Sequence, residues 1–241
     1  MTEPRLSRRD LIRLGLLGGP ALAAGSCGWT GGPLEPGLRA VSRVNDWVGE
    51  EVLQSSRRLA PEYALSERTP PRLFPAYSRT KPLPRLDDPA AWALEVGGLV
   101  RRPARLTLAT IETLPRLSYT VKHHCVEGWT AIATWTGVPV ATVAALVEPT
   151  AEARYLRFDS FDAAGRYYNG WDLESAMHPQ TILAYAFNDG PLGFEHGAPL
   201  RLYAPIKLGY KLTKYLTRMT FTAQRPGGYW EDRGYPWFAG V

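Results

Sequence analysis

The stretch "YTVKHHCVEGWTAIATW", residues 119–135, decides the fold of this chain. It places Cys125 directly after His123 and His124, two of the four histidines in the sequence. Its first part, residues 119–125, is rich in β-branched and aromatic side chains and predicts a strand. A cysteine that follows two histidines is compatible with a nucleophile and its base, with a metal site, or with an ordinary buried strand end.

The alternation of side chains along a strand restricts the first two alternatives. Cys125 and His123 would share one face of the strand, whereas His124 would point to the other. No glycine-rich oxyanion feature follows the cysteine. A structural zinc or copper site has little support, because His178 and His196 stand apart from this cluster and from each other. A lone thiolate instead suits a soft, redox-active metal whose other ligands come from a cofactor.

The composition is that of a globular protein with many loops. The chain has 241 residues, enough for one sizeable core, with 45% apolar and 21% charged residues. Its 21 prolines and 23 glycines favour short strands over a helix bundle. A net charge of +5 is too weak a field for general nucleic-acid binding, but it leaves room for a local anion site.

The N-terminus has the pattern of an export signal. In "SRRDLIRLGLLGGPALAAGSC", residues 7–27, a pair of arginines precedes an apolar run that is too short for a transmembrane helix. This pattern resembles the twin-arginine signal. Small residues stand directly before Cys27, so its lipidation and simple cleavage nearby are the alternatives. We therefore expect an exported protein of the periplasm or cell envelope, in which Cys125 would be an unpaired thiol that needs burial or ligation.

The chain after this signal (residues 1–27) divides into three parts. Residues 28–67 are predicted to form a tether and an amphipathic helix, with apolar positions from Leu38 to Leu59 and a stop at Pro61. Residues 68–225 are predicted to form one mixed, strand-rich α+β domain. Residues 226–241 form an aromatic C-terminal tail.

Within the domain, the alternation of apolar residues predicts most elements. Strands are expected in 92–100, 119–125, 154–160, 165–173, 198–205 and 214–224, with a strand running into a short helix in 106–115 and a helix in 138–147. A hairpin turn is expected at 163–165. The segment 179–190 is predicted to be either a helix or a buried strand that ends at Asn188.

Two segments carry a family resemblance. "HHCVEGWTAIATWTGVPVATV", residues 123–143, resembles the metal-ligating segment of the sulfite oxidase-fold molybdopterin-dependent oxidoreductases, and in particular their bacterial branch of periplasmic methionine-sulfoxide reductase catalytic subunits. Residues 172–222, which contain "HGAPLRL" and "GYKLTK", resemble the second signature of that family. The resemblance spans about residues 68–225. It implies a strand-rich, sulfite oxidase-type molybdopterin-binding domain behind an N-terminal helical arm.

The resemblance implies a set of site residues. Cys125 is the expected thiolate ligand of molybdenum in a molybdenum-molybdopterin cofactor, and His124 is expected to face the pterin. The first cofactor-wrapping loop of the family matches Phe74, Pro75, Ala76 and Tyr77, although its usual asparagine is absent. The remaining cofactor-binding positions are Ser160, His196, Arg201, Gly209, Tyr210, Lys211 and Lys214.

The charges of residues 201–214 support a phosphate site independently. Four cations flank the glycine-aromatic pair Gly209–Tyr210 within this stretch, namely Arg201, Lys207, Lys211 and Lys214. A phosphate group requires cations and a close approach of the backbone, which glycine permits. The alternative is a solvated basic strand edge.

The residues after Cys125 bear on the substrate. Sulfite-oxidising members of the family place an arginine soon after their cysteine, but here Glu127 and Trp129 follow, without a cation. A pocket walled by Trp129 and Trp135 favours a small neutral sulfoxide or N-oxide, although both tryptophans could equally be core residues. Glu127 is expected to be structural or to form a hydrogen bond near the pterin, and not to be catalytic. The alternatives are sulfite-type oxidation, or a non-catalytic pterin-binding or interaction protein.

Partners are predicted from what the sequence lacks. It contains no heme-attachment motif, so electrons are expected to come from a membrane heme protein or cytochrome. The chain ends soon after the second signature, without the immunoglobulin-like dimerisation domain of sulfite oxidases, so a monomer is expected. The tail "PGGYWEDRGYPWFAGV", residues 226–241, would cover the core or dock the redox partner. Nucleic acid is not an expected partner.

Overall fold

A computed structural model describes residues 35–49, 58–76, 83–84, 86, 88, 91–161 and 167–241. The chain divides into two units, residues 1–44 and 45–241, and all described strands belong to the second. The predicted export signal, residues 1–27, and the predicted turn at 163–165 lie outside the described residues.

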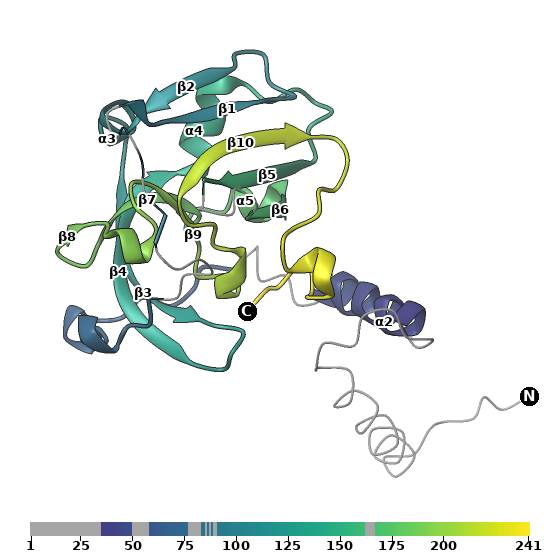
Figure 1. Ribbon diagram of the computed structural model, residues 1–241, viewed down its shortest axis with the longest axis horizontal. Helices are drawn as coiled ribbons and strands as arrows, with labels where there is room; N and C mark the ends of the chain where they lie inside the picture. Colours follow the sequence, from purple (N-terminus) through teal and green to yellow (C-terminus); the bar gives the residue numbers. More distant parts are fainter. Residues whose placement is uncertain are drawn as a thin grey trace, which may run out of the picture. The chain divides into compact units, whose positions relative to one another are not determined.

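Two five-stranded sheets make up the second unit (Figure 1). The first sheet has the order β2-β1-β10-β5-β6, and all its pairs are antiparallel except β1 with β10. Its strands are β1 (Ala93–Gly98), β2 (Ala104–Thr107), β5 (Tyr155–Ser160), β6 (Tyr168–Asp172) and β10 (Leu216–Thr222). The second sheet has the order β3-β4-β7-β8, with β9 paired to β7. Its strands are β3 (Leu117–His124), β4 (Thr130–Pro139), β7 (Ile182–Phe187), β8 (Gly190–Pro191) and β9 (Arg201–Tyr203).

The helices are short. The α-helices are α2 (Glu35–Trp47), α3 (Leu108–Glu112), α4 (Val140–Val147) and α5 (Leu173–Ala176). The 3₁₀ turns are η3 (Leu65–Glu67), η4 (Pro71–Leu73), η6 (Phe194–His196), η7 (Gly209–Lys211) and η8 (Glu231–Arg233). In the part of the chain that the structure describes, no helix combines the length and apolar character needed to cross a membrane. The predicted α+β class is confirmed.

Most elements lie where the sequence predicts them, but helix α2 has different bounds. Helix α2 begins at Glu35, before the predicted start, because Pro36 suits the first turn of a helix. It ends at Trp47, and Arg58 and Leu59 are not helical, so the prediction of a helix up to Leu59 was wrong. The alternatives left open for residues 179–190 are resolved as strand β7.

Strand β4 is the longest of the elements that the sequence did not predict; the others include α5 and β8. It pairs with β3 on one side and with β7 on the other. Its register against β7 shifts between Thr136 and Gly137, as at a β-bulge. A Cβ atom at Gly137 would lie 2.1 Å from the carbonyl oxygen of Leu183, so only glycine allows the two strands to approach here. This strand returns the chain from the loop that carries Cys125.

One hydrophobic core joins the two sheets. Leu94 and Phe158 enter it from the first sheet, and Trp135 and Leu183 enter it from the second. The rings of Trp135 and Tyr203 stack with their centroids 4.1 Å apart. Trp135 is fully buried, so it is a core residue rather than the predicted pocket wall.

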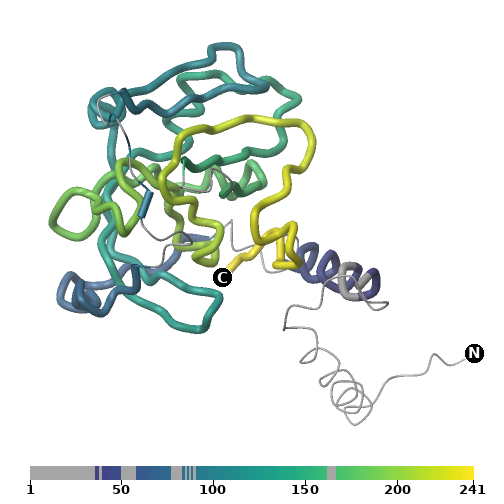
Figure 2. The backbone as a smooth tube through the Cα atoms, in the orientation of Figure 1, coloured from purple at the N-terminus to yellow at the C-terminus, as the bar shows by residue number. Residues whose placement is uncertain are grey.

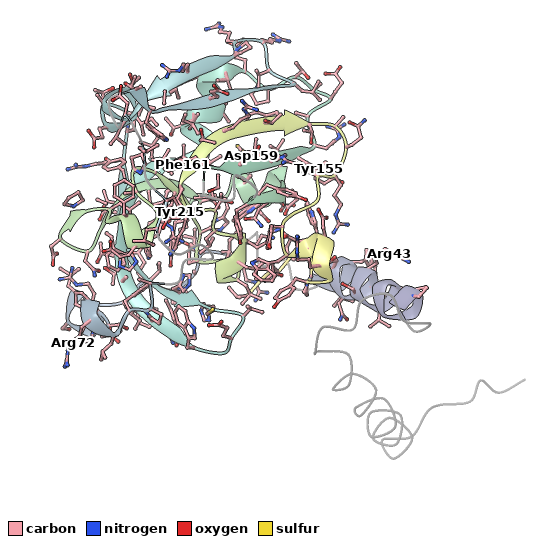
Figure 3. All side chains as sticks on the ribbon, in the orientation of Figure 1. Arg43, Arg72, Tyr155, Asp159, Phe161 and Tyr215 are labelled. Carbon is pink, nitrogen blue, oxygen red and sulfur yellow. The ribbon has the colours of Figure 1, made fainter. Side chains whose placement is uncertain are left out.

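The C-terminal tail is built into this unit. Figure 2 shows the chain leaving β10 and returning beside the loop between β9 and β10, where Lys207 and Gly240 pair as an isolated bridge. Trp237 and Phe238 of the tail are buried. The end of the tail is therefore packed into this unit, although its residues do not belong to the hydrophobic core cluster. Outside the tail, Phe161 directly follows β5 and Tyr215 directly precedes β10, and their rings pack with centroids 5.7 Å apart (Figure 3).

Candidate active site

A cavity of about 210 Å³ lies beside the end of β3. It brings together segments that are far apart in sequence: the Cys125 loop, the end of β5, η6, β9, η7 and the tail. The predicted site residues that line it are Phe74, Pro75, Cys125, Ser160, His196, Arg201, Gly209, Tyr210 and Lys214. The sequence thus predicted a set of residues that the fold collects in one place.

Three of the predicted residues that the structure describes do not line this cavity. His124 does not, whereas His123 does, because β3 alternates and His123 shares the face of Cys125. Ala76 lines a neighbouring, shallower cavity that shares Phe74 with the first. Tyr77 lies outside the described residues.

Lys211 is the third of these residues. Its side chain is only 1% exposed, and its ammonium group donates to Glu231 and to two carbonyl oxygens in the interior. The predicted role of Lys211 as a direct cofactor ligand is therefore wrong for its ammonium group. The 3₁₀ turn η7 leaves Gly209 and Tyr210 in the cavity wall and directs Lys211 into the protein.

The Cys125 loop is a tight turn between β3 and β4. The amide of Cys125 donates to the carbonyl oxygen of Trp129 at 3.0 Å, and the amide of Gly128 donates to the carbonyl oxygen of Cys125 at 3.1 Å. Gly128 has a φ of +89°, a conformation that favours glycine. This turn holds Cys125 partly exposed at the cavity wall.

Glu127 lies between the thiol and Trp129. Its Oε2 accepts a hydrogen bond from Trp129 Nε1 at 3.0 Å and lies 3.8 Å from Cys125 Sγ. Trp129 thereby fixes the carboxylate, which agrees with the structural role predicted for Glu127. Trp129 lines the cavity, as the sequence analysis predicted, and packs against His123 with ring centroids 5.4 Å apart.

The titration of these groups does not suit a thiol nucleophile. Burial raises the pKa of the Cys125 thiol, and the neighbouring Glu127 carboxylate raises it further. Burial also lowers the pKa of His123 to about 3, and Arg201 adds to this effect. A protonated thiol beside a weakly basic imidazole is the reverse of an activated cysteine-histidine pair.

A buried positive charge also lines the cavity. Arg201 is 4% exposed, and its guanidinium donates to the carbonyl oxygens of His196 at 2.8 Å and Leu212 at 3.3 Å. It also lies 4.8 Å from the ring centroid of Trp135. Burial lowers the pKa of Arg201 to about 10. The pKa of Lys214 falls to about 7, first through burial and then through repulsion by Arg201. A bound anion would relieve this repulsion.

These residues fit a molybdopterin cofactor. Cys125 offers a soft thiolate ligand, and Arg201 and Lys214 provide the cations that the anionic groups of the pterin require. Among the described residues, His123 Nδ1 is buried without a hydrogen-bond partner. A Cβ atom at Gly209 would lie 2.8 Å from His123 Nε2, so glycine is needed where η7 approaches this ring. Within the described residues, no group of three His, Cys, Asp or Glu side chains could hold a metal ion.

Several cavity residues were not predicted. They are His123, Val126, Tyr167, Leu212, Tyr215, Trp230 and Tyr235. The period of two along β3 could have identified His123. Trp230 and Tyr235 belong to the aromatic tail. The sequence shows that the tail is rich in aromatic residues, but their spacing does not predict that they lie at this cavity.

The fold and the site together define a class of protein. The family described as "Oxidoreductase molybdopterin binding domain" matches residues 80–230. The chain belongs to this family and is a molybdenum-dependent oxidoreductase with a sulfite oxidase-type fold, as the sequence resemblance predicted.

Individual relatives agree with this assignment. A protein of Azospira oryzae, provisionally named protein-methionine-sulfoxide reductase subunit YedZ1, is 40% identical over 233 residues, which cover 97% of this chain and 87% of the relative. The protein-methionine-sulfoxide reductase catalytic subunit MsrP of Xanthomonas axonopodis pv. citri is 33% identical over 160 residues, which cover 58% of this chain and 48% of the relative.

A solved structure shows the same fold. The sulfane dehydrogenase SoxCD from Paracoccus pantotrophus aligns with a TM-score of 0.54 and 22% identity, over 57% of this chain and 40% of the other. At this identity the similarity establishes the fold, while the chemistry rests on the residues of the cavity.

Proposed function

We propose that this protein reduces a small neutral sulfoxide, with N-oxides as a second substrate class, at a molybdenum-molybdopterin cofactor bound through Cys125. The observation that carries the proposal is the cavity that joins the Cys125 thiol to two cations, the buried Arg201 and the partly buried Lys214. Two relatives named as methionine-sulfoxide reductase subunits support the choice of substrate.

Two chemically different kinds of residue line the cavity. Arg201 and Lys214, with the close backbone approach at Gly209, would hold the anionic groups of the pterin. Rings of Phe74, Trp129 and other aromatic residues also line the cavity, and the organic part of a substrate would pack against them. The bound cofactor supplies two-electron chemistry, and the overall reaction consumes the sulfoxide, two electrons and two protons and yields the sulfide and water.

The surroundings of Cys125 favour a neutral substrate over sulfite. The nearest charged side chain that contacts the thiol among the described residues is Glu127, at 3.8 Å. A carboxylate at this position repels a dianion, whereas a sulfoxide carries no net charge. No cation occurs among the residues from Val126 to Trp129. Sulfite-type oxidation is therefore the disfavoured alternative.

The setting of the reaction is also a proposal. Export through the twin-arginine pattern of residues 7–27 would place the enzyme in the periplasm or cell envelope, with lipidation of Cys27 as one mode of anchoring. Electrons would come from a membrane heme protein. The naming of both relatives as subunits supports a partner for electron delivery.

The experiment is a reductase assay on protein exported with its signal intact. Reduced viologen serves as the electron donor with methionine sulfoxide, dimethyl sulfoxide or trimethylamine N-oxide, beside an assay of sulfite oxidation. We expect sulfoxide reduction that a Cys125→Ala variant lacks. Activity with sulfite alone would overturn the substrate assignment. Folded full-length protein without molybdenum would support a non-catalytic role instead.

A further inference from the structure

The C-terminal tail contributes two aromatic rings to the active-site cavity. Trp230 and Tyr235 line it together with Cys125. Their ring centroids are 5.2 Å apart, and the ring of Tyr235 meets that of Tyr210 edge-on at 5.3 Å. Tyr235 is 36% exposed, so this side of the cavity faces solvent. The tail thus forms part of the wall of the cavity that contains Cys125.

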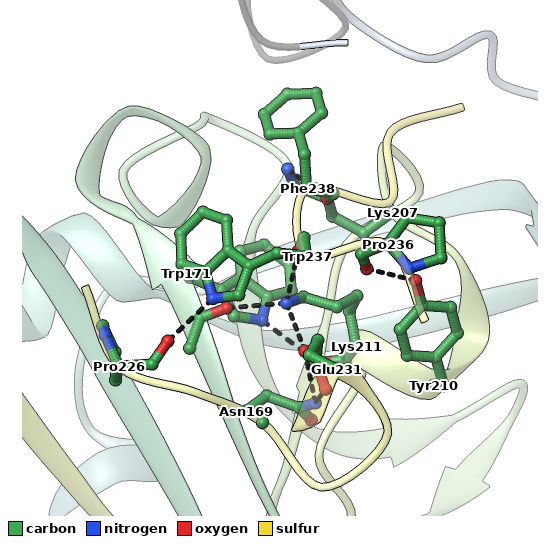
Figure 4. Close-up of polar contacts among 12 residues, drawn as sticks. Asn169, Trp171, Lys207, Tyr210, Lys211, Pro226, Glu231, Pro236, Trp237 and Phe238 are labelled. Atoms are coloured by element: carbon green, nitrogen blue, oxygen red, sulfur yellow. Dashed lines mark hydrogen bonds and ion pairs between the residues drawn. The ribbon is translucent and has the colours of Figure 1, made fainter. Parts of the chain in front are cut away.

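A buried ion pair fixes the tail. Lys211 Nζ lies 2.5 Å from Glu231 Oε1, next to Trp230, and donates to the carbonyl oxygens of Gly170 and Trp237 at 2.7 Å each (Figure 4). All three hydrogens of the ammonium group therefore have acceptors. Asn169 Nδ2 donates to the same carboxylate at 3.1 Å. The ion pair joins the tail to β6 and η7.

Further contacts fold the tail on itself. Trp237 Nε1 donates to the carbonyl oxygen of Pro226 at 2.7 Å, and the Tyr210 hydroxyl donates to that of Pro236 at 2.6 Å. A Cβ atom at Gly228 would lie 2.1 Å from Glu231 Oε2, so the turn before Trp230 requires glycine. A wall with this many interior contacts keeps its position while ligands enter.

We infer that Trp230 and Tyr235 set the size of the molecules that reach Cys125, and that Lys211 and Glu231 are positioning residues for this wall. The inference rests on the proposed function where it concerns sulfoxides. Aromatic faces suit the alkyl groups and the sulfur of a sulfoxide. Two fixed rings limit the bulk of its substituents, so substrate selectivity lies in a segment that follows all the strands of the fold.

The first test compares sulfoxides of different size. In Trp230→Ala and Tyr235→Ala, the ratio of kcat/KM for methyl phenyl sulfoxide to that for dimethyl sulfoxide should rise about tenfold. Molybdenum content should equal that of the wild type. Tyr229→Ala is the matched control, because its ring packs on Trp230 at 5.2 Å but does not line the cavity. An unchanged ratio in both cavity variants with normal molybdenum content would overturn the inference.

A second test does not depend on catalysis. In cofactor-free protein with Cys27→Ser, the alkylation rate of Cys125 is measured with iodoacetamide and with a bulky maleimide. Trp230→Ala should accelerate the bulky reagent about tenfold relative to the small one, and Tyr229→Ala should not. Equal acceleration of both reagents, or none, would contradict the wall. This assay measures access to Cys125 even if the wild type reduces no sulfoxide. A wild type without sulfoxide reductase activity would refute only the proposed function.

The positioning pair is tested by Glu231→Gln, which keeps the shape of the side chain and removes its charge. We expect the selectivity ratio to change in the same direction as in Trp230→Ala, together with faster amide exchange in residues 226–241. Trp237→Phe loses the hydrogen bond to Pro226 and reduces the ring contacts with Arg225 and Lys211, but it keeps the Lys211–Glu231 pair, and it should give a smaller change of the same kind. Loss of kcat without a change in selectivity or exchange would contradict the positioning role.

Discussion

Two pairs of cations come from the same stretch, residues 201–214, and have different surroundings. Arg201 and Lys214 line the cavity, where Arg201 donates to carbonyl oxygens and Lys214 donates to the carbonyl oxygen of Glu195 at 2.7 Å. Lys207 and Lys211 instead bind the tail. The carboxylate of Glu231 neutralises Lys211. The positions of the four cations in the sequence do not distinguish the two pairs, whereas the groups that each cation contacts do.

The two pairs of cations therefore have different roles. Arg201 and Lys214 line the cavity, where their charges would attract an anionic group. Lys207 Nζ lies 3.2 Å from the ring centroid of Phe238 and donates to its carbonyl oxygen at 2.8 Å. The tail pair is therefore structural, and the cavity pair is the candidate cofactor site. Variants of each residue can break or sharpen this distinction.

The largest expected effect is on stability, in Lys211→Met. Removing one partner of a buried ion pair leaves the Glu231 carboxylate without compensation, which should lower the free energy of unfolding by about 3–5 kcal/mol. Chemical denaturation measures this change. The matched control is Arg218→Met in the pair with Glu95, whose side chains are 57% and 52% exposed. There the change should stay within about 1 kcal/mol. Equal losses in both variants would contradict the structural role of Lys211.

The next effect is on cofactor retention, in Lys214→Met. Loss of a charge-assisted hydrogen bond of about 1.5–3 kcal/mol should weaken binding of the pterin about 10- to 100-fold. The stability of the cofactor-free protein should fall far less than in Lys211→Met. Pterin fluorescence after oxidation, per mole of protein, measures retention. Lys122→Met, which removes a cation of β3 placed over the ring of Tyr63, is the control. Equal retention in the two variants would refute the cavity cations as the anion site.

A smaller loss of stability is expected for Lys207→Met. Its carboxylate partner, Asp172, is 3.5 Å away, retains contact with solvent and also caps α5 through the amide of Ser175. Removal of the ammonium group therefore leaves no buried carboxylate without a partner, and the free energy of unfolding should fall by about 1–3 kcal/mol. The same denaturation experiment measures it. A loss of stability as large as that of Lys211→Met would show that the buried Glu231 carboxylate is not the reason for the larger effect at Lys211.

The smallest effect is a dependence of stability on pH. Burial, with Arg201 as the second cause, lowers the pKa of His196 to about 4. The unfolded chain binds this proton near pH 6.5, the ordinary range of histidine. The stability that neutral His196 contributes is thus present above pH 6.5 and is lost as the pH falls toward 4. In cofactor-free protein, His196→Gln should make the fall of the melting temperature between pH 6.5 and 4 less steep. Parallel profiles would contradict this assignment.

The fold was predictable where side chains alternate. Residues 92–100 and 154–160 show the period of two and form strands. Strand β4 was missed because the burial of its side chains does not alternate. A bulge at Thr136–Gly137 shifts its register, and the strand pairs with β3 at one edge and with β7 at the other. Short-range periodicity carries no information about such a shift.

The site was predictable for residues that the family signatures carry, and less so for those that tertiary contacts decide. Cys125 and Arg201 lie in the cavity as expected, whereas His123 replaced His124 through simple strand alternation. The role of Lys211 depends on Glu231, twenty positions along the chain in a segment without regular structure beyond one 3₁₀ turn. No pattern in the sequence joins these two residues.

The central claim is that one thiolate and two cations hold a molybdenum cofactor in this cavity. Its most direct test is the molybdenum and pterin content of the full-length exported protein, measured side by side in the wild type, Cys125→Ala and Lys214→Met. We predict stoichiometric molybdenum in the wild type, none in Cys125→Ala, and reduced pterin in Lys214→Met. Folded wild-type protein without molybdenum, or Cys125→Ala with as much molybdenum as the wild type, would contradict the account.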